Sequence, residues 1–227
     1  DVSNAIRKAE GSLSHYPDGS LVCVENTSQG GGGTAYPLER LDAICKVARE
    51  KNCKLHLDGA RLFNAAAASN TSPARIVRDF DTVSICLSKG LGAPVGSVLV
   101  GSKETLAEAH RWRKMFGGGM RQSGVIAAAG LYALENNVDR LHDDHKRARR
   151  LAEAVNEIDG LSVNLDAVQS NIVFIGIEKG KTQEVIGALS KQGVEILGID
   201  DSTVRAVFHL HITDEDVEKA IEAFTQI

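Results

Sequence analysis

Residues 84–97 read Ser84-Ile-Cys-Leu-Ser-Lys-Gly-Leu-Gly-Ala-Pro-Val-Gly-Ser97. An apolar run ends at Ser88 and Lys89, a glycine-rich turn follows it, and a second apolar run begins beyond the turn. This pattern predicts a lysine at a strand end, between buried segments, where partial burial would lower the pKa of its ammonium group. A neutral lysine amine can attack an aldehyde cofactor and form a Schiff base, and pyridoxal phosphate is the commonest such cofactor. The alternative for this motif alone is a surface lysine in a glycine turn.

A carboxylate stands upstream at the end of another predicted strand. The segment Lys54-Leu-His-Leu-Asp58 alternates and then breaks at Gly59, so Asp58 lies where open α/β sheets bind their ligands. The chain between Asp58 and Lys89 has room for one helical crossover. A pyridoxal ring needs a carboxylate against its pyridine nitrogen, and the pair of residues therefore favours pyridoxal 5'-phosphate. The alternative for Asp58 alone is an N-cap for the alanine-rich segment 61–68.

Strand and helix patterns alternate along the chain, which predicts an α/β fold with a mostly parallel sheet. We expect strands over 20–25, 54–58, 82–87 and 96–100. We expect helices over 1–10, 38–51 (with Pro37 as its first residue), 62–68, 103–113, 124–135 and 139–157. The helix over 124–135 is rich in small apolar residues and is expected to be buried.

A domain boundary is predicted near Asp159-Gly160. Beyond it we expect strands over 162–164, 171–175, 194–197 and 205–209, and helices over 182–192 and 214–226. Thr213 and Asp216 predict a capped start for the last helix. The predicted domains are therefore residues 1–158, with the larger sheet, and residues 159–227, a small α+β domain.

Composition limits the function classes. The chain of 227 residues has a net charge of −4 and 43% hydrophobic residues, with no long apolar run, so we expect no nucleic-acid partner and no membrane span. With no visible signal peptide, a cytoplasmic location is expected. The cysteines and histidines lack metal-site spacing, although His209 and His211 would share one face of a strand. Cys23 and Cys86 are expected to be reduced core residues.

Three motifs together resemble the low-specificity L-threonine aldolases, which are pyridoxal-phosphate enzymes of the aspartate-aminotransferase fold type. They are His-Leu-Asp-Gly-Ala-Arg at 56–61, the segment 85–97, and Arg-Trp-Arg-Lys-Met-Phe-Gly-Gly-Gly-Met-Arg-Gln-Ser-Gly at 111–124. The resemblance runs from about Glu25 to the C-terminus in matching order. It implies that residues 1–158 are the remainder of a large cofactor-binding domain and that residues 159–227 are the small domain of that fold type.

The resemblance also implies roles for individual residues. Lys89 corresponds to the Schiff-base lysine and Asp58 to the partner of the pyridine nitrogen. Arg61 and Arg205 correspond to two arginines that clamp the substrate carboxylate, which suits a planar guanidinium. The residues that reach the cofactor phosphate of a neighbouring subunit correspond to Lys114 and Arg121. A homo-oligomer, a dimer or tetramer with shared active sites, is therefore expected.

Two departures from the family pattern stand out. The family usually reads Glu-Asn-Thr-His after the first of these strands, where this chain has Glu25-Asn-Thr-Ser28. A serine at position 28 cannot act as a near-neutral base, so the acceptor of the substrate hydroxyl proton and the preference between threo and erythro substrates stay open. The family's N-terminal segment has no counterpart here, which suggests the C-terminal part of a longer polypeptide and allows an N-terminal partner chain.

The activity implied by the resemblance is retro-aldol cleavage. L-Threonine, L-allo-threonine and related β-hydroxy-α-amino acids would be split into glycine and an aldehyde. One alternative is a pyridoxal-phosphate lyase that eliminates a β-substituent. Another is an inactive C-terminal fragment or subunit that needs an N-terminal chain.

Overall fold

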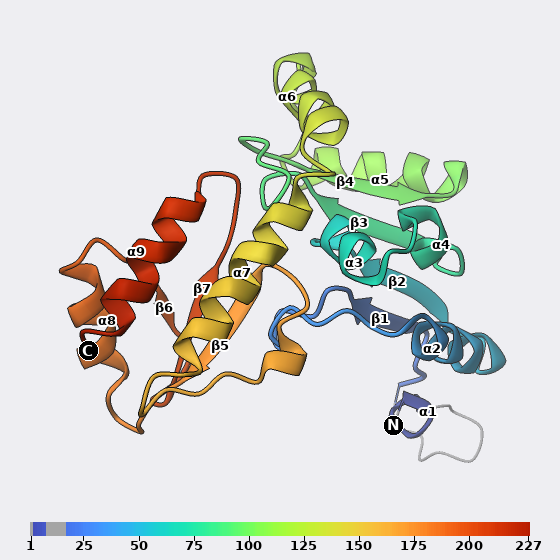
Figure 1. Ribbon diagram of the computed structural model, residues 1–227. Helices are drawn as coiled ribbons and strands as arrows, with labels where there is room; N and C mark the ends of the chain where they lie inside the picture. Colours follow the sequence, from blue (N-terminus) through green and yellow to red (C-terminus); the bar gives the residue numbers. More distant parts are fainter. Residues whose placement is uncertain (1, 8–16) are drawn as a thin grey trace.

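The computed structural model describes residues 2–7 and 17–227. The predicted α/β class is confirmed, because strands and helices alternate along the chain and the strands form two sheets (Figure 1). The helix expected over residues 1–10 is present as α1 (Val2–Ala5), and residues 1 and 8–10 of that prediction lie outside the described residues. Within the described part, no helix is long and apolar enough to cross a membrane.

The first sheet has the order β1-β2-β3-β4. Its strands are β1 (Leu21–Glu25), β2 (Lys54–Asp58), β3 (Thr82–Cys86) and β4 (Ser97–Gly101). The first three are parallel, as predicted, and β4 runs antiparallel to β3. The accompanying helices are α2 (Leu38–Glu50), α3 (Leu62–Ser69), α4 (Pro73–Val77), α5 (Lys103–Met115) and α6 (Gly124–Asn136).

Two helix starts differ from the sequence prediction. Pro37 is the N-cap of α2 rather than its first residue. The helix therefore begins at Leu38, and the fixed φ of Pro37 belongs to the residue that precedes it. The short helix α4 was not predicted, although it has a recognisable start. Ser72 accepts a hydrogen bond from the backbone N–H of Arg75, and Pro73 occupies the first helical position.

The second sheet is antiparallel, with the order β5-β7-β6. Its strands are β5 (Ile172–Gly176), β6 (Leu197–Gly198) and β7 (Thr203–Val207). The helices of this part are α7 (Leu141–Val155), the single 3-10 turn η1 (Leu165–Ala167), α8 (Thr182–Ser190) and α9 (Asp214–Phe224). The predicted cap of α9 is confirmed as a full capping box between Thr213 and Asp216.

Several strand predictions in this part were wrong in extent. The strand expected over 162–164 is a single bridge between Ser162 and Gly176, and the one expected over 194–197 pairs only at Leu197–Gly198. The strand expected over 205–209 ends at Val207, which pairs with the first residue of β5. His209 and His211 therefore lie beyond the ladder and do not share a strand face.

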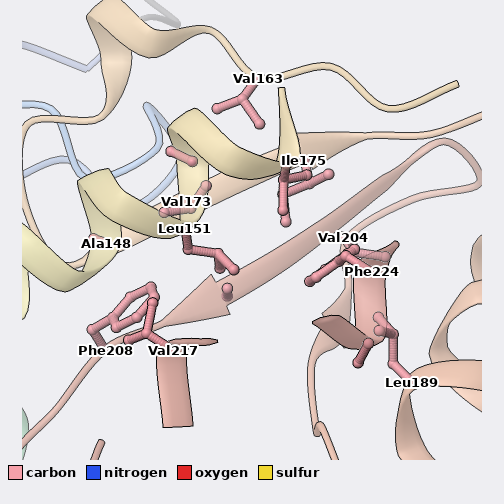
Figure 2. Close-up of a cluster of buried hydrophobic side chains, with 14 residues drawn as sticks. Ala148, Leu151, Val163, Val173, Ile175, Leu189, Val204, Phe208, Val217 and Phe224 are labelled. Carbon is pink, nitrogen blue, oxygen red and sulfur yellow. The ribbon is translucent and has the colours of Figure 1, made fainter. Parts of the chain in front are cut away.

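Helix α7 joins the two sheets (Figure 1). It packs against α3 on one side and against β5 and α9 on the other. Its apolar face enters the larger core, shown in Figure 2, which is built from α7, the second sheet and α9. Fully buried members of this core are Leu151, Val155, Ile175, Val204 and Phe224. We retain the division of the chain at residue 158 as a proposal.

The expectation that α6 is buried was wrong in this structure. Only Gly130 and Ala133 are buried, and α5 has no buried residue. Apolar composition predicted a core helix, but the described residues cover only one edge of α6.

The four cysteines are free, as expected, but Cys23 is exposed on β1 and Cys86 is half-buried, so the expected core position is wrong for Cys23.

Candidate active site

The carboxyl ends of three parallel strands define the candidate site. The register aligns Glu25 of β1 with Asp58 of β2, and Asp58 with Ser84 of β3. Lys89 follows the end of β3 by a few residues. Because parallel strands end at the same edge of a sheet, the predicted pair Asp58 and Lys89 lies at one edge.

Asp58 is held by its own turn and presents its carboxylate to solvent. Its Oδ1 accepts a hydrogen bond from the backbone N–H of Ala60 at 3.0 Å, and the side chain is exposed. Helix α3 is preceded by Arg61 as its N-cap, without a side-chain cap bond, so the alternative reading of Asp58 as the N-cap is not supported. An oriented, accessible carboxylate fits the partner that a protonated pyridine nitrogen requires.

Lys89 stands on a compact turn. The backbone N–H of Ala93 donates to the carbonyl of Leu87 at 3.0 Å, and that of Gly92 donates to the carbonyl of Lys89 at 2.9 Å. The expected partial burial of Lys89 was wrong, because its side chain is exposed, whereas Leu87 and Gly90 on either side are buried. An accessible primary amine on an ordered turn can take a covalently attached aldehyde cofactor.

Arg61 and Arg205 both have buried guanidinium nitrogens that lack a hydrogen-bond partner among the described residues. Arg61 is 9% exposed, and its Nε and Nη1 have no partner among the described residues, nor has Nε of Arg205. Burial lowers the pKa of Arg61, and the positive charge of Arg205 lowers it further, while Glu25 and Asp58 act in the opposite direction. Buried charges normally have counter-charges, so this pair of cations is arranged to receive an anion such as a carboxylate.

Ser28 lies in the tight loop that follows β1. Its Oγ accepts the N–H of Gly31 at 3.3 Å, and its backbone pairs with Thr34. Ser170, in the segment just before β5, holds the same loop by donating its hydroxyl to the carbonyl of Gly33 at 2.6 Å. The loop is therefore fixed at both ends, and Ser28 has a defined place beside the end of β1.

Lys114 and Arg121 lie elsewhere. They line an open pocket of about 570 Å³ at the end of α5, together with His110, Arg111 and Arg113. Neither Lys89 nor Asp58 lines this pocket. The structure therefore places Arg61 near Asp58 and Arg205, with Lys89 following the end of β3 at the same sheet edge, and Lys114 and Arg121 line a separate pocket.

Two further residues belong to this edge. Glu25 lies in register with Asp58 and acts electrostatically on Arg61. Thr27 is 1% exposed, and its Oγ1 has no hydrogen-bond partner among the described residues. The sequence signalled Glu25 through its position at the end of a strand. It carried no comparable signal for Thr27, whose burial depends on how the loop folds back.

Comparison with known proteins adds independent information. The sequence model of the beta-eliminating lyases matches residues 1–178. A probable low-specificity L-threonine aldolase of Arabidopsis thaliana is 45% identical over 229 residues, covering 100% of this chain and 64% of that protein. The low specificity L-threonine aldolase of Escherichia coli K12 is 40% identical over 203 residues, covering 89% and 59%. The chain thus spans about three-fifths of these relatives' length.

Solved structures share the fold. The threonine aldolase of Leishmania major superposes with a TM-score of 0.81 at 23% identity, over 100% of this chain and 66% of that one. A serine palmitoyltransferase of Sphingomonas wittichii superposes with a TM-score of 0.72 at 16% identity, over 100% and 57%. At these identities the likeness concerns the fold alone.

Proposed function

Because the chain belongs to the beta-eliminating lyase family, we propose that it is part of a pyridoxal-phosphate-dependent threonine aldolase, an aldehyde lyase. Its substrates would be L-threonine, L-allo-threonine and related β-hydroxy-α-amino acids, cleaved to glycine and an aldehyde. The observation that carries this proposal is the pair Arg61 and Arg205, near Asp58, in which Nε and Nη1 of Arg61 and Nε of Arg205 are buried without a hydrogen-bond partner among the described residues. Two arginines that can bind a carboxylate, together with the Lys89 amine and the Asp58 carboxylate, suit an amino-acid substrate bound to this cofactor.

The residues present fit the cofactor. Lys89 would hold it covalently, and Asp58 would keep its pyridine nitrogen protonated. Lys114 and Arg121 of a neighbouring copy would contact its phosphate, since neither lines the site of its own chain. When bound, pyridoxal 5'-phosphate supplies an electron sink for the carbanion that bond cleavage creates. A homo-oligomer with shared active sites would complete this arrangement.

The chain's own side chains orient the substrate. Arg61 and Arg205 fix the carboxylate, which sets the direction of the Cα–Cβ bond. Ser28 Oγ, held by Gly31, can hydrogen-bond the β-hydroxyl but is a poor proton acceptor near neutral pH. We assign the acceptance of that proton to a water molecule. In this proposal residues 1–158 carry the cofactor, residues 159–227 supply Arg205, and the protein works in the cytoplasm.

Product analysis tests the activity. The complete protein containing this sequence is incubated with L-threonine and with L-allo-threonine. Glycine and acetaldehyde in equal amounts are expected, and Lys89→Ala should abolish both. Ammonia and a keto acid would instead favour the second candidate, a β-eliminating lyase, which the description of the matching family supports. No product from either route would favour the remaining alternative, an inactive subunit.

A further inference from the structure

The turn that carries Lys89, residues 87–93, leaves two of its carbonyl oxygens to be bonded from outside. Its internal hydrogen bonds use the carbonyls of Leu87 and Lys89. The carbonyls of Gly90 and Leu91 are met instead by side chains from the junction between α6 and α7. Asn137 Nδ2 donates to Leu91 at 2.8 Å, and Arg140 Nη1 donates to Gly90 at 3.4 Å, the longer and weaker of the two.

The same junction packs closely on the turn. A Cβ at Gly90 would lie 3.0 Å from Leu141 Cδ2, so a side chain there would force Leu141 of α7 to shift. Gly92 has a φ of +74°, and a Cβ there would lie 2.9 Å from Leu210, in the segment after β7. The apolar residues of the turn also share a small core with the ends of α6 and α7. The turn is therefore seated on three elements distant in sequence.

Arg140 is itself fixed. Both of its terminal nitrogens bond the carboxylate of Asp144, one turn further along α7, and the Asp144 side chain is fully buried. A buried carboxylate with a single cationic partner restricts that partner to one arrangement. The Arg140 guanidinium therefore lies in a set position when it meets Gly90.

Lys89 has no comparable restraint of its own. Its side chain is exposed, and none of the described residues forms a hydrogen bond or ion pair with its ammonium group. The backbone therefore sets where the Lys89 side chain begins, and that backbone is held through the carbonyls of Gly90 and Leu91.

We propose that Asn137, supported by Arg140, is a positioning residue for Lys89. This role rests on the proposed function, because it matters only if Lys89 holds the cofactor. Asn137 fixes the peptide between Leu91 and Gly92, Arg140 meets the peptide between Gly90 and Leu91, and together they hold the turn from which Lys89 projects at the edge of the sheet where Asp58 stands. The neighbouring Asn136 provides a matched contrast, because its Nδ2 bonds the carbonyl of Tyr132 within α6 and does not touch the turn.

The first test needs no cofactor. Hydrogen–deuterium exchange is measured on the complete protein, freed of cofactor, for the peptide that spans residues 87–93. Loss of one net hydrogen bond of about 1 kcal/mol corresponds to a roughly fivefold change, so Asn137→Ala should exchange about fivefold faster in this peptide. Asn137→Asp, of nearly the same shape without the donor, should behave alike. Asn136→Ala and Asn136→Asp should match the parent protein.

The second test measures the bound cofactor. The ratio of visible circular dichroism to absorbance should fall in Asn137→Ala and Arg140→Lys, and the cofactor dissociation constant should rise roughly fivefold, with Asn136→Ala unchanged. Arg140→Lys keeps a cation for Asp144 and so avoids a buried unpaired charge. If the parent protein carries its cofactor on Lys89 and the Asn137 and Asn136 variants behave alike, the positioning role is wrong and the proposed function stands. A parent protein with no cofactor on Lys89 would overturn both.

Discussion

Two regions of the molecule both carry large apolar side chains, but these are buried in one region and exposed to solvent in the other. In the closed region, formed by α7, α9, β5 and β7, Phe224 is fully buried and Leu151 is 2% exposed. In the open region, formed by β4, α5 and α6, Phe116 is 83% exposed and Leu131 is 60% exposed. Apolar side chains therefore form a packed core in one region and lie on an uncovered surface in the other.

The candidate site divides along the same line. Arg205 and the supports of the Lys89 turn belong to the closed region or border it, and Arg61 lies near enough to Arg205 and Asp58 of the same chain for their charges to act on it. Lys114 and Arg121 belong to the open region. The roles proposed for Lys114 and Arg121 therefore depend on what covers the open region. The proposed binding of the substrate carboxylate by Arg61 and Arg205 does not depend on it.

The largest expected effect contrasts one phenylalanine from each region. Phe224→Ala should lower the free energy of unfolding by about 3–5 kcal/mol, because it leaves a cavity in a packed core. Phe116→Ala, the matched change at an exposed position, should stay within about 0.5 kcal/mol. Urea-induced unfolding of the 227-residue chain measures both. Equal costs for the two variants would show that the open region is covered in solution and would break the comparison.

The closed region should also lose stability in acid through His145. Burial, and then the charge of His142, lower the pKa of His145 to about 4, and its Nε2 lies 3.1 Å from Asn64 Nδ2. The unfolded chain takes up this proton near pH 6.5 and the folded chain does not, so stability is lost as the pH falls from about 6.5 to about 4. The loss is up to about 3 kcal/mol.

Replacing the histidine tests this assignment. His145→Gln should flatten the acid limb of a plot of unfolding free energy against pH, because glutamine can still accept from Asn64 and does not titrate in this range. The matched control is His110→Gln, at an exposed position on α5, which should keep the slope of the parent. An unchanged slope in His145→Gln would mean that another group causes the acid sensitivity.

The smallest of the three effects concerns the carboxylate clamp. Arg205→Ala should weaken binding of glycine about tenfold to a hundredfold, since a charge-assisted contact contributes about 1.5–3 kcal/mol. The absorbance of the cofactor should stay as in the parent. Arg150→Ala is the control, because Arg150 of α7 forms an exposed ion pair with Glu218 of α9. If both variants bind glycine like the parent protein, Arg205 has a structural role instead.

Sequence reasoning worked best where periodicity and register determine the outcome. The bounds of β1, β2 and β3 were predicted to within one residue, and their parallel arrangement follows from the crossovers between them. It worked less well where the outcome depends on neighbours. The burial of α6 and the length of β6 depend on what packs beside them, which an isolated apolar pattern does not contain.

The site shows the same limit. Asp58, Lys89 and Arg61 were predicted from motif residues, and Arg205 from the family resemblance. In the structure, strand register aligns Asp58 with the end of β1, and the charge of Arg205, on β7 of the second sheet, acts on Arg61. Asn137 was missed because a side-chain amide at a helix end resembles many others. Its hydrogen bond to Leu91 joins positions distant in sequence, so only the folded chain reveals it.

The most direct test of the account locates the cofactor. The complete protein is treated with borohydride, which fixes an amine-linked aldehyde cofactor, and is then digested and mapped by mass spectrometry. The account predicts one labelled peptide, with the label on Lys89, and no label in Lys89→Ala. A label on any other lysine, or an unlabelled parent protein, would contradict it.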